Sequence, residues 1–116
     1  MLKTMTDITK TKSKYIRMSP RKVRLVLDLV RGMNAQEALE MLKFVNKTAA
    51  KPVYKAVKTA VADAENNFDK DPEKLFIVEA RADEAPTLKR GRAVSRGRYH
   101  RILKRASHIV IGVSEK

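Results

Sequence analysis

The chain has 116 residues, no cysteine, and a formal net charge of +13 from 26 Lys and Arg against 13 Asp and Glu. This length favours a single domain, and the lack of cysteine excludes disulfides, thiolate metal sites and a cysteine nucleophile. No apolar run reaches the roughly 20 residues that a membrane span needs, and residues 1–14 lack the apolar stretch of a signal peptide. We therefore expect an intracellular protein with no membrane contact.

The positive charge is concentrated at the two ends of the chain. Residues 1–27 contain eight basic residues and one acid, and residues 85–116 contain nine basic residues and one acid. Residues 28–84 are nearly neutral, with nine basic and eleven acidic residues. A solvated surface without a partner would mix the two signs, whereas a strong excess of one sign usually has a polyanionic partner. The two ends are therefore predicted to build a binding surface for a polyanion.

The first part of the chain predicts an arm, a short strand and a helix. Residues 1–13, rich in Thr, Lys and Ser, predict a flexible basic arm, and residues 14–116 predict one globular domain. Tyr15 to Met18 alternate weakly and predict an edge strand. Ser19-Pro20 predicts a helix start, since Ser can cap free N–H groups and Pro suits the first helical position. The apolar stripe of this helix is Val23, Val26, Leu27 and Val30, and Gly32 ends it.

Two more helices are predicted in the neutral middle of the chain. Asn34 begins one of them, and Glu37 stands where a capping box needs it. The inner face of that helix is Ala38, Met41, Leu42 and Val45. The next helix runs to about Asn66-Asn67, with an apolar stripe of Val53, Ala56, Val57, Ala60, Val61 and Ala64. Pro52 predicts that this helix either starts or bends there.

Two strands follow, separated by a basic segment. Leu75 to Asp83 alternates in polarity, with Phe76, Val78, Ala80 and Ala82 on the face predicted to be buried. Ser107 to Val113 predicts the second strand through Ile109, Ile111 and Val113. Because no helical pattern separates the strands, a hairpin is the expected connection.

Residues 84–106 are too many for an ordinary hairpin turn. After Glu84 this segment contains no acid and eight Lys or Arg, so it cannot fold back on itself without charge repulsion. It predicts an extended basic hairpin that reaches some 35 Å from the domain and is ordered only against a polyanion. Arg matches phosphate with a planar fork, and Tyr99 could stack on a base. The candidate RNA-binding residues here are Lys89, Arg90, Arg92, Arg96, Arg98, Tyr99, Arg101, Lys104 and Arg105. A disordered basic tail or an import signal is the alternative.

A second basic cluster lies at the start of the first predicted helix. It consists of Arg17, Arg21, Lys22 and Arg24. Cations at a helix N-terminus oppose the helix dipole, which makes sense if a phosphate lies between them and the free N–H groups. The alternative is a solvated face with no ligand.

The residue combinations that enzymes and metal sites need are missing. His100 and His108 are the only histidines, with no HExxH motif, so we expect no metal. No P-loop or dinucleotide fingerprint occurs, and nothing pairs a nucleophile with a base, so we expect no cofactor and no enzyme activity. The aromatic motifs of an RNA-recognition domain are also absent. Recognition of RNA by shape and phosphate is therefore the expected mode.

Three separated motifs resemble the bacterial ribosomal protein L twenty-two family. They are Tyr15–Arg24 (YIRMSPRKVR), Ala62–Asn67 (ADAENN), and a C-terminal set made of Asp83-Glu84, Leu88–Arg90, Gly97-Arg98 and Arg101–Ile109. The similarity runs in order from about Lys14 to Lys116. It implies an α+β fold, with three helices packed on a small three-stranded antiparallel sheet and a long protruding basic β-hairpin.

The resemblance also implies a function. Members of this family are structural proteins of the large ribosomal subunit, in the cytoplasm, that bind large-subunit rRNA and support assembly. Their hairpin lines the nascent-peptide exit tunnel, next to ribosomal protein L four, so the expected partners are rRNA, neighbouring ribosomal proteins and the nascent peptide. No homo-oligomer is expected. On matching positions, both basic clusters would hold rRNA, and so would His108, which belongs to the matching C-terminal motif.

The hairpin tip departs from the family pattern. Gly91 and Arg92 stand where the family usually has apolar residues, and Ala93 stands where Pro is common. Tyr99 and His100 replace a smaller and an acidic residue. As a hypothesis, Arg92 makes the tunnel constriction more positive than usual. Two other functions remain open: a free RNA- or DNA-binding protein, and a basic partner for an acidic protein or membrane surface.

Overall fold

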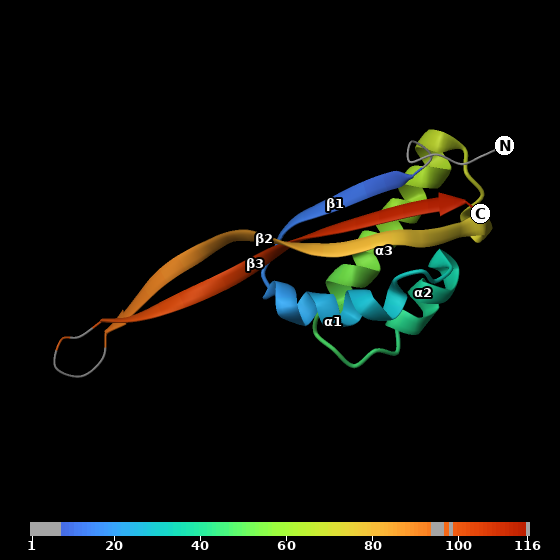
Figure 1. Ribbon diagram of the computed structural model, residues 1–116. Helices are drawn as coiled ribbons and strands as arrows, with labels where there is room; N and C mark the ends of the chain where they lie inside the picture. Colours follow the sequence, from blue (N-terminus) through green and yellow to red (C-terminus); the bar gives the residue numbers. More distant parts are fainter. Residues whose placement is uncertain (1–7, 94–96, 98, 116) are drawn as a thin grey trace.

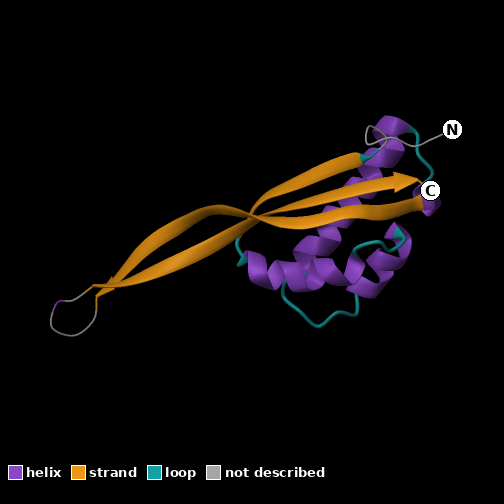
Figure 2. Ribbon diagram, in the orientation of Figure 1, coloured by secondary structure: helices purple, strands orange, loops and turns teal. Residues whose placement is uncertain are grey.

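The computed structural model describes residues 8–93, 97 and 99–115, which form one layer of helices on one small sheet (Figures 1 and 2). The elements in chain order are β1 (Thr9–Ile16), α1 (Pro20–Val30), α2 (Ala35–Leu42), α3 (Ala50–Phe68), the short 3-10 helix η2 (Pro72–Lys74), β2 (Leu75–Ala93) and β3 (Tyr99–Glu115). The sheet is antiparallel, with strand order β1-β3-β2. The predicted α+β class is therefore confirmed.

The predicted hairpin is a continuation of two strands of the core sheet. β2 and β3 stay paired from Leu75↔Glu115 in the domain to Ala93↔Tyr99 far outside it. They leave the domain together, so the molecule measures 68 × 29 × 20 Å along its principal axes. The register shifts between Ala85 and Leu88, where the pair leaves the core.

The helices begin and end close to the predicted residues. Pro20 is the first residue of α1, but the side chain of Ser19 makes no capping hydrogen bond. Gly32, with φ +82°, ends the turn after α1 in a conformation that favours glycine. The Asn34 side chain accepts a hydrogen bond from the backbone N–H of Gln36 (3.0 Å) and so caps α2. Pro52 lies in the first turn of α3, where no helical hydrogen bond is lost.

The core lies between the helices and one face of the sheet, and it is almost entirely aliphatic. The largest side chains with less than 2% exposure include Leu27, Leu75, Ile77, Ile109 and Ile111. α3 contributes a stripe of buried Ala and Val, whose small side chains let the helix backbone approach its neighbours closely. The predicted apolar stripes of α1 and α3 are confirmed by this burial.

β1 is longer than the edge strand predicted at Tyr15 to Met18. Thr9, Thr11 and Ser13 pair with Val113, Ile111 and Ile109 of β3. Residues 9–13 are therefore a strand and not part of a flexible arm, because their backbone groups complete the edge of the core sheet. Residues 1–7 of the predicted arm lie outside the described residues.

The buried face of β2 was assigned wrongly around Val78. The register shifts between Ile77 and Glu79, which reverses the alternation along the strand. Leu75 and Ile77 point into the core before this bulge, and Ala80 and Ala82 do so after it. Val78 is consequently 42% exposed. A prediction from alternating polarity assumes one regular strand, so it assigns the wrong face to residues on one side of a bulge.

Candidate nucleic-acid interface

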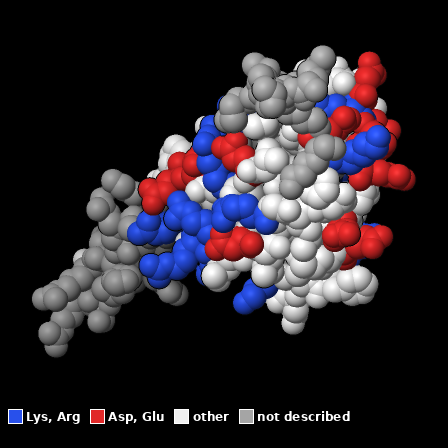
Figure 3. Space-filling view, turned by 45° about the vertical axis from the view of Figure 1, so that its right-hand side comes forward, with Lys and Arg blue, Asp and Glu red and all other residues white. Residues whose placement is uncertain are grey.

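The two basic segments predicted from the sequence lie at the same end of the molecule. α1 begins where β2 and β3 leave the domain as the hairpin (Figure 1). The side chain of Ser107 in β3 donates a hydrogen bond to the carbonyl of Met18 and fastens this junction. Figure 3 shows Lys and Arg side chains gathered beside the hairpin on the face in view. Two segments that are about 70 residues apart in the sequence thus lie at the same end of the fold.

Three cations at the start of α1 are available to a ligand. Arg17, Arg21 and Lys22 are exposed, and within the described ranges none of them forms an ion pair or a side-chain hydrogen bond. No acidic residue lies in the first turn of α1 either. Their charge is therefore not neutralised by the fold, as expected of a surface that binds phosphate.

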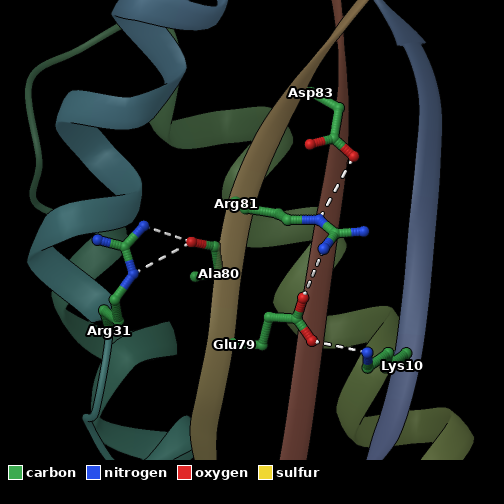
Figure 4. A network of polar contacts seen from close by, with 6 residues as sticks. All are labelled: Lys10, Arg31, Glu79, Ala80, Arg81 and Asp83. Atoms are coloured by element: carbon green, nitrogen blue, oxygen red, sulfur yellow. Dashed lines mark hydrogen bonds and ion pairs between the residues drawn. The ribbon is translucent and has the colours of Figure 1, made fainter.

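Arg24, the fourth member of this predicted cluster, is exposed but makes a hydrogen bond to a neighbouring strand. Its Nη2 donates a hydrogen bond to the carbonyl of Ala82 in β2 (3.0 Å). Seven residues later, Nε of Arg31 donates to the carbonyl of Ala80 (3.2 Å), as shown in Figure 4. The turn after α1 adds two backbone bonds to Ile77 of the same strand. α1 and its C-terminal turn therefore cover the outer edge of β2.

The predicted hairpin contacts lie on paired strands, but their side chains are not described. Lys89, Arg90 and Arg92 pair in register with Leu103, Ile102 and His100. Tyr99, Arg101 and Lys104 pair with Ala93, Gly91 and Leu88. Arg96 and Arg98 lie outside the described residues. Arg105 is exposed beside the register shift at which the hairpin leaves the core.

His108 makes contacts that the sequence did not predict. Its Nδ1 accepts a hydrogen bond from the backbone N–H of Tyr15 (3.1 Å). The two rings also meet edge to face, with centroids 5.0 Å apart and an interplanar angle of 85°. The ring nitrogen Nδ1 of His108 is thus bound to Tyr15, the first residue of the predicted edge strand.

The face of the sheet turned away from the helices carries a network of ion pairs (Figure 4). Glu79 binds Lys10 of β1 and Arg81 of β2, each at 3.0 Å, and Arg81 also approaches Asp83 at 3.4 Å. Lys10 and Glu79 belong to the two outer strands and meet across Gly112 of β3, which pairs with both. Because Gly112 has no side chain, the ion pair can cross the central strand. The carboxylates of this face are therefore neutralised internally.

This geometry fits binding of an anionic polymer and offers no catalytic centre within the described residues. No group of three His, Asp or Glu side chains in those ranges could hold a metal ion. Among the same residues, no helix has the length and apolar content that a bilayer crossing requires. What the fold provides is exposed positive charge at one end and a projecting pair of strands.

Sequence reasoning missed one part of this surface, the lysines of β1. Lys10 and Lys12 alternate with Thr and Ser residues that face the core, and Lys14 follows them; all three lysines are exposed. The signal was present as a strict alternation of Lys with Thr or Ser over residues 9–14. That alternation is typical of a strand with one polar face, but low hydrophobicity led to its interpretation as an arm.

Comparisons with known proteins identify the family of this chain. The family model described as "Ribosomal protein L22p/L17e" matches residues 11–114. A protein of Clostridium novyi named "Large ribosomal subunit protein uL22" is 55% identical over 104 residues, which cover 90% of this chain and 94% of the relative. Proteins of the same name are 49% identical over 104 residues in Clostridium tetani (90% and 94%) and 52% identical over 99 residues in Rubrobacter xylanophilus (85% and 78%). The chain therefore belongs to the ribosomal protein L22p/L17e family.

Proposed function

We propose that this chain binds large-subunit rRNA with the end of the domain from which the hairpin leaves, and that the hairpin lines the nascent-peptide exit tunnel. As a member of this family, the chain is a structural constituent of the large ribosomal subunit and not an enzyme. The bacterial large subunit is cytoplasmic. The observation that carries the rRNA proposal is the convergence of two basic segments on one end of an elongated molecule.

The rRNA contacts divide into two groups with different roles. Arg17, Arg21 and Lys22 would hold phosphates at the domain, where the fold leaves their charge without a partner among the described residues. The basic residues of the hairpin would hold rRNA along its length and support assembly of the subunit. Since Arg24 binds the carbonyl of Ala82, its effect on rRNA would come mainly through the shape of the domain.

The tunnel proposal rests on family membership together with one feature of the fold. That feature is the paired extension of β2 and β3, which projects far from the core. The partners would then be ribosomal protein L four and the nascent peptide. Arg92 pairs with His100 near the end of the paired region, and its charge would make such a constriction more positive.

Sedimentation of the tagged chain through a sucrose gradient tests the rRNA proposal. Cell lysate is run at low and at moderately high salt. Simple phosphate contacts should weaken by about 10³-fold or more over such a change, so retention on the large subunit at both salts indicates embedded recognition. Movement to the top of the gradient at moderate salt would favour a free nucleic-acid binder instead.

Charge variants locate the surface. Replacement of Arg17, Arg21 and Lys22 by Gln should lower affinity for large-subunit rRNA and reduce the salt slope by roughly 0.7–0.9 for each phosphate that is no longer neutralised. The matched control replaces Lys55, Lys58 and Lys74, three exposed lysines on α3 and η2, by Gln. Equal reductions in both triple variants would show that net charge alone governs binding, and would reject a localised surface.

A further inference from the structure

Tyr15 has an unusual combination of conformation and exposure. Its φ is +59°, in the left-handed region that bulky residues seldom adopt. It lies at the irregularity in β1, where pairing with β3 shifts between Ser13 and Ile16. Its side chain is nevertheless 64% exposed, so burial of the ring does not compensate for the backbone conformation. Strained residues held by their surroundings are concentrated at binding and catalytic sites.

The ring of Tyr15 packs against the ring of His108. The imidazole of His108 accepts the backbone N–H of Tyr15 and packs against its ring at 85°. A contact that involves an edge leaves much of the aromatic surface open to solvent, which agrees with the exposure of the side chain. The fold therefore presents a pre-oriented aromatic ring, and ordering it for a ligand costs little conformational entropy.

Exposed cations lie next to Tyr15 in the sequence. Lys14 and Arg17 lie close to Tyr15 in the sequence, are exposed, and form no ion pair with any described residue. The carboxylate nearest in register to His108 is that of Asp83, and Arg81 already binds it at 3.4 Å. Lys12 continues the line of exposed cations along β1. An aromatic ring among free cations suits a nucleotide, because the base can stack while the phosphates are held by charge.

We propose that Tyr15 is a stacking platform for an unpaired RNA base, with His108 as its positioning residue and Lys14 and Arg17 as phosphate contacts. This inference rests on the rRNA binding proposed above and adds a contact of a different kind. It predicts that the domain end prefers single-stranded or bulged RNA to a continuous duplex, whose bases are not free to stack on a side chain.

A thermodynamic cycle with a base-free strand tests the stacking. The full chain is titrated into a fluorescein-labelled oligouridylate and into an abasic strand of the same length and charge. Tyr15→Ala should weaken binding of the oligouridylate by about 5- to 100-fold and leave binding of the abasic strand unchanged. Tyr15→Phe should bind both strands like the wild type. Phe68→Ala is the control, since it removes another exposed aromatic ring, 58% exposed, at the end of α3.

Stability measurements separate this role from a structural one. Tyr15→Gly removes the ring and also the backbone strain, so the variant should fold at least as stably as Tyr15→Ala and still lose binding of the oligouridylate. His108→Ala should produce a smaller loss on the oligouridylate than Tyr15→Ala, and no loss on the abasic strand. If Tyr15→Ala and Tyr15→Gly weaken both strands equally, or neither, the stacking role is wrong.

The two proposals can fail separately. Loss of sedimentation with the large subunit, in a chain whose oligouridylate binding still depends on Tyr15, would overturn the ribosomal rRNA site alone. Retained sedimentation with no dependence on Tyr15 in the cycle would overturn the stacking platform alone.

Discussion

Replacement of Arg31 by Met tests whether α1 seals the edge of β2. Met keeps much of the aliphatic length of Arg and removes every hydrogen-bond donor. Nε of Arg31 donates to the carbonyl of Ala80 at 3.2 Å, and a second N–H donates to the same oxygen. The guanidinium also binds Asp28 at 2.5 Å, three residues earlier on α1. The substitution removes both interactions together, so their contributions have to be separated.

The expected loss of stability follows from the exposure of the groups. A hydrogen bond from a charged donor contributes about 1.5–3 kcal/mol when buried, but the Arg31 side chain is 47% exposed and water can replace part of it. We take roughly 1 kcal/mol for the contact with Ala80. The pair with Asp28, whose side chain is 60% exposed, adds about 0.3–0.5 kcal/mol. Arg31→Met should thus lower the free energy of unfolding by about 1.5 kcal/mol, or on the order of 5 °C in Tm.

Urea denaturation followed by circular dichroism measures this difference directly. Asp28→Ala is the matched control, since it removes only the ion pair and should cost at most about 0.5 kcal/mol. Equal unfolding free energies for Arg31→Met and Asp28→Ala would mean that the contact with Ala80 contributes nothing. The backbone hydrogen bonds of Ile77 with the turn after α1 would then be what holds α1 against the edge of β2.

Two further substitutions test the core and the turn after α1. Leu27 is fully buried, so Leu27→Ala should lower the free energy of unfolding by about 2–5 kcal/mol in the same urea assay. A loss below about 1 kcal/mol would mean that the core collapses around the cavity. Gly32 has φ +82°, and a Cβ atom added to it would meet no atom within 4 Å beyond its chain neighbours. Gly32→Ala should therefore cost about 1–2 kcal/mol from backbone strain alone. Thermal denaturation measures this loss. If Gly32→Ala had the Tm of the wild type, the turn would have relaxed into another conformation.

Elements with a regular apolar pattern could be predicted from the sequence. The stripe of α1 at Val23, Val26, Leu27 and Val30 determines both the helix and its buried face, because neighbours on a helix surface lie three or four residues apart. The long hairpin could also be predicted, because residues 84–106, between two apolar strands, are too many for a turn and too charged for a core.

β1 has an alternating pattern of Lys with Thr or Ser but no apolar face, and this made it harder to predict. Thr, Lys and Ser residues become a strand here because β3, about 100 residues later in the chain, offers them an edge to pair with. Such a partner is a tertiary effect and overrides local propensity. The bulge at Val78 is similar, since it adjusts the strand to neighbours that only the folded chain provides.

The sequence predicted which residues belong to the candidate site, but not which of them make contacts within the fold. Arg21 and Arg24 look equivalent as charges at the start of a helix. Both are exposed, but only Arg24 donates a hydrogen bond to β2, at the carbonyl of Ala82, among the residues that the structure describes. The conformation of Tyr15 left no trace in the sequence, since nothing in its neighbours demands a positive φ.

Because β2 and β3 run without a break from the core into the hairpin, the core sets the register of the hairpin strands. Ile109, Ile111 and Val113 fix the registration of β3 by burial, and the same strand carries Arg101 and Lys104 outside the domain. If β3 slipped by one residue, its core side chains would turn to solvent. Packing at one end of the molecule therefore fixes the backbone register of the projecting strands over distances of up to about 30 Å. A core substitution that shifts this register would therefore change how the two projecting strands pair, although the substituted residue lies far from any bound RNA.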